Sequence, residues 1–411
     1  MFESIPADFN FPKSEENILK FWNENQIFQK TLEYRKDAPA FVFYEGPPTA
    51  NGLPHPGHVL TRVIKDLLPR YKTMRGFRCL RKAGWDTHGL PVEIEIEKEL
   101  GIDGKEQILD YGVEPFVRKC FDSVFRYVRQ WEQLTQRIGY WIDMNDPYVT
   151  CSTDYVESVW WALSEIFKKG LLYRGHKIVP YCPRCGTVLS SHEVGQGYKD
   201  VDDPSIYVAF RTKANPKEYL LAWTTTPWTL ISNVALVVKK DYTYARVKIG
   251  DEVLIMAEPL VKQVMGKKEY EILETFPGEK LVGMEYEPLY TYATTNKRAW
   301  YVVEADFVTL DTGSGIVHCA PAFGADDYAV GQKYDLPVVQ MVDARGKFKS
   351  EVTPWAGQFF KEVDPKVITD LKERGLLFRR ENYKHSYPFC WRCDTPLIYY
   401  AREGWFIKTT A

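Results

Sequence analysis

Two short cysteine motifs constrain the fold of this chain more than any other feature. Each holds two cysteines separated by two residues: Cys182 and Cys185 in YCPRCG, and Cys390 and Cys393 in FCWRCD. Structural Zn²⁺ takes four ligands in a tetrahedron, and one such motif supplies only two of them. If both motifs bind one zinc ion, the roughly 200 residues between them leave the body of the protein and return to it. The motifs then bracket an inserted domain; two separate metal sites, or plain free thiols, are the alternatives.

The composition indicates a protein that works in water with reduced thiols. Lys and Arg number 53 and Asp and Glu 55, so no overall positive field favours DNA as a partner. No apolar run is long enough to cross a bilayer, and no basic-then-apolar segment at the N-terminus predicts export. Eight cysteines, half of them in the two motifs, favour a reducing compartment. We therefore expect a cytoplasmic, monomeric protein of two or three domains without a membrane partner.

Before the first cysteine motif, the sequence alternates between strand, loop and helix patterns. FVFYEG (41–46) predicts a short buried strand that ends in glycine. Helical spacing predicts helices over residues 1–38, 59–76, 115–138 and 153–169. Pro69 should kink or break the second of these helices, and Gly170 should end the last one. Strands that alternate with helices in this way are typical of an α/β sheet.

After the first cysteine motif, the sequence becomes rich in β-branched and aromatic residues. Segments such as SIYVAF, YLLAW, NVALVV and EVLIMA have this character, and Gly250-Asp251 marks a turn. These patterns predict a β-barrel-like insert over roughly residues 200–385, with a helix near 365–375. A last strand, LIYYA (397–401), is expected after the second motif.

The first chemical motif is His55-Pro56-Gly57-His58, between the predicted strand and the helix that follows. A helix N-terminus presents unpaired N–H groups and partial positive charge, so it is a natural seat for phosphate. Gly57 allows a ligand to approach the backbone closely, and the two imidazoles can face one oxyanion. By itself the motif also fits a turn with two histidines and no ligand.

Longer segments around this motif resemble a known family. YEGPPTANGLPHPGH and GWDTHGLPVEIEIEKELGI closely resemble class I aminoacyl-tRNA synthetases, and among them the isoleucine-specific enzymes. YCPRCGTVLSSHEV, LLAWTTTPWTL, GSGIVHCAPAFGADD and HSYPFCWRCDTPLIYYA extend the resemblance from about residue 40 to residue 411. Two departures stand out: Pro56 replaces the isoleucine of the histidine motif, and Ile231-Ser232 replaces the Pro-Gly or Pro-Ser of many relatives.

The resemblance implies a split Rossmann-type nucleotide-binding fold. Its first half is present, and an inserted β-barrel-like editing domain rests on a zinc-knuckle base. The implied domains are a helical arm with the first strand (1–45), the first Rossmann half (46–181), a zinc knuckle (182–199), the editing domain (200–385), and a second knuckle with the return to the catalytic domain (386–411).

The resemblance also implies an activity, that of an isoleucine–tRNA ligase. Such enzymes use ATP, with Mg²⁺, to convert isoleucine to isoleucyl-adenylate and pyrophosphate. They then transfer the isoleucyl group to tRNA(Ile). In-line attack on the α-phosphorus needs positioning and charge stabilisation more than a base. His55 and His58 are then catalytic, and Asp86 holds the substrate ammonium. The ATP-binding residues implied are Gly46, His55, Gly57 and His58, and the amino-acid-binding residues are Pro47 and Asp86.

A second, hydrolytic site is expected because a pocket for isoleucine cannot exclude valine well. One missing methylene is worth only about 1–3 kcal/mol, a limit for which the isoleucine enzyme is itself the standard example. By analogy Asp327 pairs with the ammonium of valyl-tRNA(Ile), His318 sets side-chain size, and threonine hydroxyls contact the ribose and the water. No general base is identified, and only the family register selects Asp327 over Asp326. The editing residues implied are Trp223, Thr224, Thr225, Thr226, His318 and Asp327, of which Thr225, Thr226, His318 and Asp327 are catalytic.

One stretch and one absence complete the expectations. Residues 62–82 hold eight basic side chains and one acid, Asp66, which fits either contact with phosphates or a solvated helix face. The lysine-rich loop and anticodon-binding domain of the family do not occur here, so the sequence predicts an N-terminal fragment that is competent at most for editing. A valine or leucine enzyme, and a non-catalytic tRNA-binding paralogue, are the alternative readings.

Overall fold

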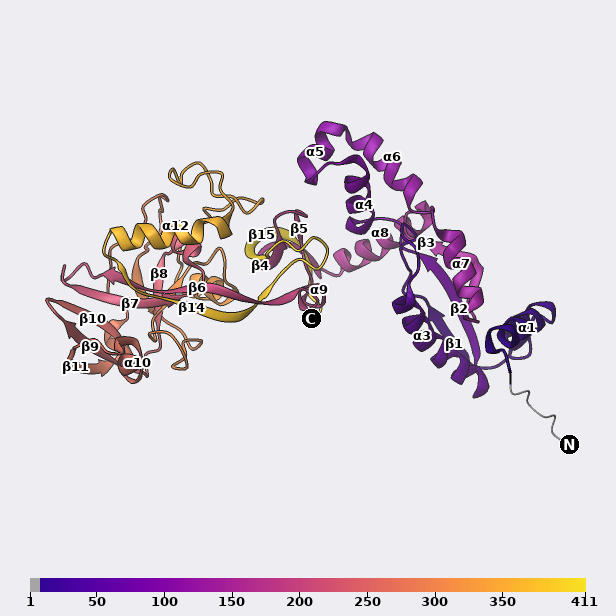
Figure 1. Ribbon diagram of the computed structural model, residues 1–411, viewed down its shortest axis with the longest axis horizontal. Coiled ribbons are helices and arrows are strands. Elements are labelled where there is room, and N and C mark those ends of the chain that lie inside the picture. Colours follow the sequence, from indigo (N-terminus) through magenta and orange to yellow (C-terminus); the bar gives the residue numbers. More distant parts are fainter. Residues whose placement is uncertain (1–7) are drawn as a thin grey trace. The chain divides into compact units, whose positions relative to one another are not determined.

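The computed structural model describes residues 8–411, which form an α/β structure of two compact units. Unit 1 comprises residues 8–172 and 408–411, and unit 2 comprises residues 173–407. Figure 1 draws unit 1 mainly in indigo to magenta and unit 2 in pink to yellow. Residues 1–7 of the expected helical arm lie outside the described part of the chain. Within the described part, no helix is both long and apolar enough to cross a membrane.

Unit 1 is built on a parallel three-stranded sheet in the order β1-β2-β3. The register pairs Ala40 with Arg78 and Tyr44 with Lys82. Parallel neighbours require a crossover connection, and α3 supplies it between β1 and β2 (Figure 1). The strands are β1 (Ala40–Tyr44), β2 (Arg78–Trp85) and β3 (Asp143–Val149). The helices are α1 (Phe11–Glu24), α2 (Ile27–Glu33), α3 (Pro56–Met74), α4 (Leu90–Leu100), α5 (Gly104–Tyr111), α6 (Val113–Ser123), α7 (Val128–Arg137) and α8 (Thr153–Lys168).

Two sequence-based expectations about these helices are wrong. The single helix expected over residues 115–138 is two helices, α6 and α7, because the N–H of Tyr127 donates to the carbonyl of Ala50 instead of to its own helix (3.0 Å). The expected break at Pro69 does not occur, and α3 continues to Met74. The turn around Pro69 is held by side chains, since the hydroxyl of Thr73 donates to the Pro69 carbonyl (2.8 Å).

Unit 2 contains a nine-stranded sheet with the order β11-β9-β10-β7-β13-β8-β12, and β6 joins β7 to β14. The long antiparallel pair β6–β14 runs from Tyr198 opposite Pro388 to Val208 opposite Leu377. A small sheet, β15-β4-β5, carries the cysteine motifs. The strands are β4 (Leu172–Cys182), β5 (Thr187–Val188), β6 (Tyr198–Arg211), β7 (Glu218–Thr224), β8 (Ala235–Val238), β9 (Thr243–Ile249), β10 (Glu252–Ala257), β11 (Glu271–Pro277), β12 (Tyr301–Glu304), β13 (Val317–Cys319), β14 (Leu377–Pro388) and β15 (Ile398–Ile407).

Short helices connect these strands, and the longest, α12, lies along the β6–β14 pair (Figure 1). It begins at Phe360, five residues before the expected helix near 365–375. The burial of Phe360 and Val363 in the core outweighs the backbone N–H that Pro365 lacks. The helices are α9 (Ser191–Gly195), α10 (Val261–Met265), α11 (Ala325–Lys333) and α12 (Phe360–Glu373), with 3₁₀ turns η1 (Pro227–Ser232), η2 (Glu258–Leu260) and η3 (Gly278–Leu281).

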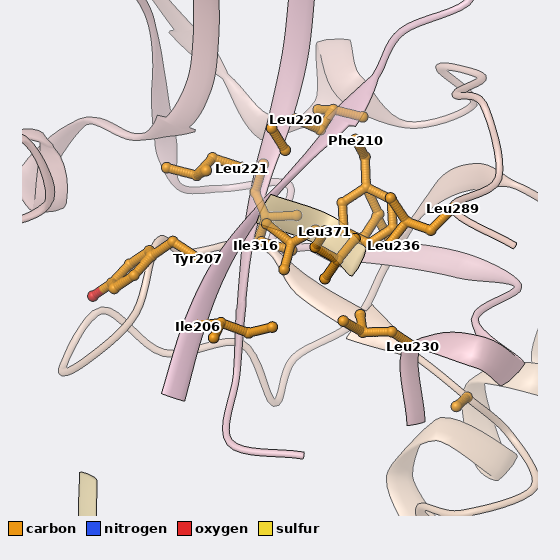
Figure 2. Close-up of a cluster of buried hydrophobic side chains, with 14 of the residues drawn as sticks. Ile206, Tyr207, Phe210, Leu220, Leu221, Leu230, Leu236, Leu289, Ile316 and Leu371 are labelled. Atoms are coloured by element: carbon orange, nitrogen blue, oxygen red, sulfur yellow. The ribbon is translucent and has the colours of Figure 1, made fainter. Parts of the chain in front are cut away.

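The main hydrophobic core lies in unit 2. Side chains from β6, β7, β8 and α12 meet there, among them Phe210, Leu220, Leu236 and Leu371, each fully buried (Figure 2). Consecutive residues of β6, β7 and β8 are buried, so both faces of these strands are covered, while α12 contributes residues spaced three and four apart. This core is what holds the threonine-rich end of β7 and the turn η1 in place.

Candidate functional site

In unit 1, the two histidines of the motif cap the first turn of α3. Nδ1 of His55 accepts a hydrogen bond from the N–H of Gly57, and Nδ1 of His58 accepts one from the N–H of His55, both at 3.1 Å. A neutral ring whose Nδ1 accepts carries its proton on Nε2, so each ring keeps one N–H donor for a ligand. Burial first, and then the neighbouring His55, lowers the pKa of His58, which favours its neutral form near pH 7.

The loop between β1 and α3 borders a cavity of about 420 Å³. Gly46, Pro47 and His58 line it, so three residues predicted to bind substrate are brought together. Asp86 follows β2, and its N–H donates to the Pro48 carbonyl in this loop (3.0 Å). His55 and Gly57 lie at the start of α3; a Cβ on Gly57 would come within 2.9 Å of the His55 ring, so a side chain there would displace that ring.

A buried charged cluster beneath this loop was not predicted from the sequence. The carboxylate of Glu45, 3% exposed, lies 3.5 Å from Arg62 and 3.6 Å from Lys65. Lys65 also donates a hydrogen bond to the carbonyl of Gly46 (2.9 Å), so a side chain of α3 anchors the loop. Burial raises the pKa of Glu45, and the two cations oppose that effect.

The basic stretch over residues 62–82 therefore fits neither alternative fully. Arg81, whose side chain is fully buried, pairs with Asp66 at 3.0 Å, and Arg70 pairs with the same carboxylate at 2.5 Å. Together with Arg62, these arginines hold unit 1 together from inside. Only the remaining basic residues of the stretch can contact phosphates or form a solvated helix face.

In unit 2, the four motif cysteines lie in one cluster, with their Sγ atoms all within 4.8 Å of one another. The two motifs have the same backbone shape. The N–H of Gly186 donates to the Cys182 carbonyl (2.9 Å) and the N–H of Asp394 donates to the Cys390 carbonyl (2.8 Å). Both residues after the motifs have positive φ, 66° and 60°, a region that glycine and aspartate tolerate best.

The geometry of the cluster fits one tetrahedral metal ion. Neighbouring Sγ atoms are 3.5 Å apart (Cys182–Cys393 and Cys185–Cys393) and 4.0 Å apart (Cys185–Cys390). Four sulfurs at about 2.3 Å from zinc lie about 3.8 Å from one another, whereas a disulfide needs about 2.05 Å. Hydrogen bonds among the thiols raise the pKa of Cys182 and lower that of Cys393, and a metal ion bound there would displace the thiol protons. The cluster can hold a metal as a single site.

The threonines at the end of β7 form a chain of hydroxyl contacts that reaches His318. Oγ1 of Thr224 is 3.3 Å from Oγ1 of Thr226, which is 3.1 Å from Oγ1 of Thr229. Thr229 in turn lies 2.9 Å from Nε2 of His318 on β13. Thr225 is half-exposed and stays outside this chain of contacts. Trp223 packs edge-on against Tyr383 at 5.4 Å.

His318 is neutral at physiological pH. Its ring is buried, and burial lowers its pKa to about 4. Nδ1 of His318 has no hydrogen-bond partner among the described residues. Since the pair Thr229–His318 already uses Nε2, Nδ1 is the buried nitrogen of this ring that is left unpaired.

Asp327 lies in the first turn of α11, beside the end of β13. Its Oδ2 accepts a hydrogen bond from the N–H of Ala320, two residues after His318 (2.9 Å). Burial raises the pKa of Asp327 to about 6, so the carboxylate still bears charge at pH 7. Asp326 is exposed, which distinguishes the two neighbouring acids by position.

The sequence analysis missed Thr229 and Asp364 in this region. Asp364, on α12, accepts a hydrogen bond from the N–H of Trp228 at 2.9 Å. Thr229 carried a local signal, because a turn that starts at Pro227 brings residues 226 and 229 together. No local signal connects Asp364 with Trp228.

Comparison with known proteins decides the family. The profile of class I tRNA synthetases (I, L, M and V) matches residues 17–411. The chain belongs to this family. An isoleucine–tRNA ligase of Clostridium acetobutylicum is 55% identical to this synthetase chain over 411 residues, which are 100% of the chain and 40% of that protein. The isoleucine–tRNA ligase of Thermus thermophilus is 53% identical over 416 residues, 100% of this chain and 39% of its own.

The synthetase chain thus spans about 40% of the length of the curated relatives it matches. Among solved structures, GlLeuRS-CP1 aligns with 43% of this chain and 99% of its own, at 16% identity and a TM-score of 0.35. A score of this size establishes no common fold.

Proposed function

We propose that this chain is part of an isoleucine–tRNA ligase that joins isoleucine to tRNA(Ile) and hydrolyses mischarged valyl-tRNA(Ile). The observation that carries the proposal is an identity of 53 to 56% over the whole chain with proteins named isoleucine–tRNA ligase. The hydroxyl chain that reaches a neutral imidazole, and a partly buried carboxylate bonded to the backbone two residues after that imidazole, support the hydrolytic activity. The enzyme acts as a cytoplasmic monomer.

In this proposal the four cysteines hold one structural Zn²⁺ at the base of an inserted editing domain. The cluster geometry supports it, and zinc supplies folding free energy there and no chemistry. The domains of the proposal are the arm and first strand to residue 45, a first Rossmann half at 46–181, the knuckles at 182–199 and 386–411, and a β-barrel-like editing domain at 200–385.

For synthesis, unit 1 contributes half of the site. The Nε2–H groups of His55 and His58 donate to the phosphates of ATP, which binds with Mg²⁺, at the N-terminus of α3. Pro47 and Gly46 border the pocket for the isoleucine side chain, and Asp86 binds the ammonium group. Gly57 lets the nucleotide approach the backbone. Activation then depends on positioning and charge stabilisation in the family manner.

For editing, Asp327 binds the ammonium of the valyl ester and His318 limits side-chain size. Thr225 and Thr226, with Thr224 and Trp223 beside them, contact the terminal ribose and the attacking water. A neutral His318 accepts a hydrogen bond and repels no ammonium, which agrees with its lowered pKa. The carboxylate and hydroxyls orient the water, and no side chain is assigned as general base.

The decisive experiment measures deacylation of valyl-tRNA(Ile) and isoleucyl-tRNA(Ile) by the purified, zinc-loaded chain. We expect faster hydrolysis of the valyl ester. Asp327→Ala should abolish this hydrolysis, because the ammonium loses its charged partner. Asp326→Ala is the matched control, since it removes an exposed acid one residue away.

Three outcomes would contradict the proposal. Equal loss of activity in both variants would mean that charge near α11, and not the buried carboxylate, matters. Preferential hydrolysis of an ester on tRNA for valine or leucine would assign the chain to a sibling synthetase, and no hydrolysis by the folded chain would remove the editing function.

A further inference from the structure

The direction of every hydrogen bond in the threonine chain follows from one contact. The hydroxyl of Thr229 donates to the carbonyl of Thr226 (2.7 Å), and a hydroxyl has only one proton to donate. The hydroxyl of Thr226 must therefore donate to Thr229, and that of Thr224 must donate to Thr226. His318 must also donate to Thr229 through Nε2, so its Nδ1 is the acceptor.

The Thr226 hydroxyl thus donates to Thr229 and accepts from Thr224. Its position in the backbone would normally give it a different role, that of a helix cap. Thr226 is the N-cap residue of the turn η1, where a threonine hydroxyl usually accepts a hydrogen bond from the second or third N–H. Its side chain makes no such bond. Pro227 has no N–H, so Trp228 provides the first turn donor that needs an acceptor.

Asp364 supplies that acceptor from another element. Its Oδ1 accepts from the N–H of Trp228 at 2.9 Å, and the residue is 4% exposed. The indole of Trp228 lies between the rings of Phe323 and Phe360, each at 4.8 Å. Because Phe360 and Asp364 both belong to α12, one helix holds the side chain and the backbone of Trp228 together.

Helix α12 is itself anchored by charge near its first turn. Lys361 pairs with Asp203 on β6 at 2.6 Å, and His385 on β14 contacts the same carboxylate at 3.1 Å. Asp364 thus faces Lys361 and Asp203, and the buried Tyr387 of β14 lies in the same field. Burial raises the pKa of Asp364 to about 7, while the Trp228 N–H and Lys361 act in the opposite direction.

We propose that Asp364 is a positioning residue of the editing site. Its carboxylate, which comes from another element, accepts the hydrogen bond that a cap residue of the turn Pro227–Ser232 would normally accept. The hydroxyl of Thr226 therefore stays in the chain of hydrogen bonds that ends at His318. The role in hydrolysis rests on the proposed editing function. Without the carboxylate, the buried N–H of Trp228 has no acceptor, so the turn Pro227–Ser232 shifts and displaces the hydroxyls of Thr226 and Thr229 that orient the attacking water. Binding of tRNA is unaffected because Asp364 is buried.

The first test is spectroscopic and independent of activity. Labelling with ¹⁵N-tryptophan reports the backbone amide of Trp228, assigned with Trp228→Phe. In the unchanged chain, we expect the chemical shift of this amide to move with pH as Asp364 titrates. In Asp364→Asn the amide should keep its chemical shift but lose the pH response. In Asp364→Ala it should lose the chemical shift of a hydrogen-bonded amide. Glu362→Ala, an exposed acid on the same helix, should behave like the unchanged chain.

The second test measures hydrolysis of valyl-tRNA(Ile). Asp364→Ala should lower kcat roughly ten- to a hundredfold, the effect of losing a hydrogen bond to a charged group, with KM nearly unchanged. Asp364→Asn keeps an acceptor oxygen and should recover most of kcat. Recovery separates positioning from a general loss of folded protein, which circular dichroism measures in parallel.

An unmoved Trp228 amide in Asp364→Ala, or kcat in Asp364→Asn as low as in Asp364→Ala, would overturn the proposal. If Asp364→Ala does not fold, the proposal is tested by comparing the pH response of the Trp228 amide in the unchanged chain with that in Asp364→Asn. If the unchanged chain hydrolyses no ester, the editing function fails, and the amide still decides whether Asp364 caps the turn.

Discussion

The two units bury their apolar side chains to very different extents. In unit 2, Leu220 and Leu236 are fully buried within one large core. In unit 1, Leu60 and Leu67 on α3 are 64% and 65% exposed. The apolar clusters of unit 1 are small, and one consists of Ala83, Tyr140 and Ile142 with their neighbours.

Several charged side chains are buried in the interior of unit 1, whereas the interior of unit 2 is a large core of apolar side chains. Glu45, Arg62, Asp66 and Arg81 are all buried there. Buried ion pairs contribute little net stability because desolvation offsets their attraction, whereas apolar burial stabilises in proportion to its area. A parallel sheet is normally covered on both faces. We therefore expect unit 2 to be stable by itself and unit 1 to expose a helix face that needs a cover.

The largest effect should come from the cysteine cluster. Cys182→Ser should remove the bound zinc and unfold the small sheet β15-β4-β5 that carries the cysteine motifs, since structural zinc contributes on the order of 10 kcal/mol of apparent free energy. Zinc content by mass spectrometry and hydrogen exchange of both units measure this. Cys120→Ser, in unit 1, is the control. Full zinc content in Cys182→Ser would refute the shared site.

A matched pair of leucine substitutions tests the comparison directly. Leu236→Ala should destabilise unit 2 by about 2–5 kcal/mol because it leaves a cavity in a packed core. Leu67→Ala should change the stability of unit 1 by less than about 0.5 kcal/mol, since the side chain is exposed. Urea unfolding followed by hydrogen exchange separates the two. An equally large effect at Leu67 would mean that the α3 face is covered in solution.

The buried acid of unit 2 makes stability depend on pH. Burial raises the pKa of Asp364 from 3.8 to about 7, so the folded state keeps a proton that the unfolded state has lost. Stability from this group is present at low pH and is lost as pH rises from about 4 to about 7. Asp364→Asn should become more stable than the unchanged chain across this window, by about 4 kcal/mol at its upper end.

Thermal unfolding of both proteins between pH 4 and pH 8 measures that gain. His318 acts in the opposite direction, because burial lowers its pKa from 6.5 to about 4 and its contribution grows as pH rises. It is common to both proteins and cancels in the difference. A difference that does not change with pH would contradict the raised pKa of Asp364.

The smallest effect is expected in the loop of unit 1. Lys65→Ala removes the hydrogen bond to the Gly46 carbonyl and a partner of Glu45, and should cost about 1 kcal/mol. Hydrogen exchange of residues 45–55 should increase, with unit 2 unchanged. Lys105→Ala removes an exposed lysine of the same unit and provides the control. Equal exchange in the two variants would mean that Lys65 does not hold the loop.

Local signals account for much of the fold. The strand at 41–46 and the helix that ends before Gly170 are confirmed, since alternation, helical spacing and a glycine with positive φ act over a few residues. The split at Tyr127 could not be predicted, because it depends on a carbonyl at Ala50. The continuity of α3 through Pro69 was not predicted either, because the residue type alone does not show whether a helix tolerates the missing N–H.

By itself, the sequence determined the elements, the four cysteines, the histidine motif and the family, because each is written in residue type and short spacing. Only the tertiary structure decided which groups meet: Glu45 with Arg62 and Lys65, and Asp364 with Trp228. Such pairs join distant segments, and their worth depends on burial, which no local pattern encodes. The charged interior of unit 1 and the external cap of the threonine turn are properties of packing.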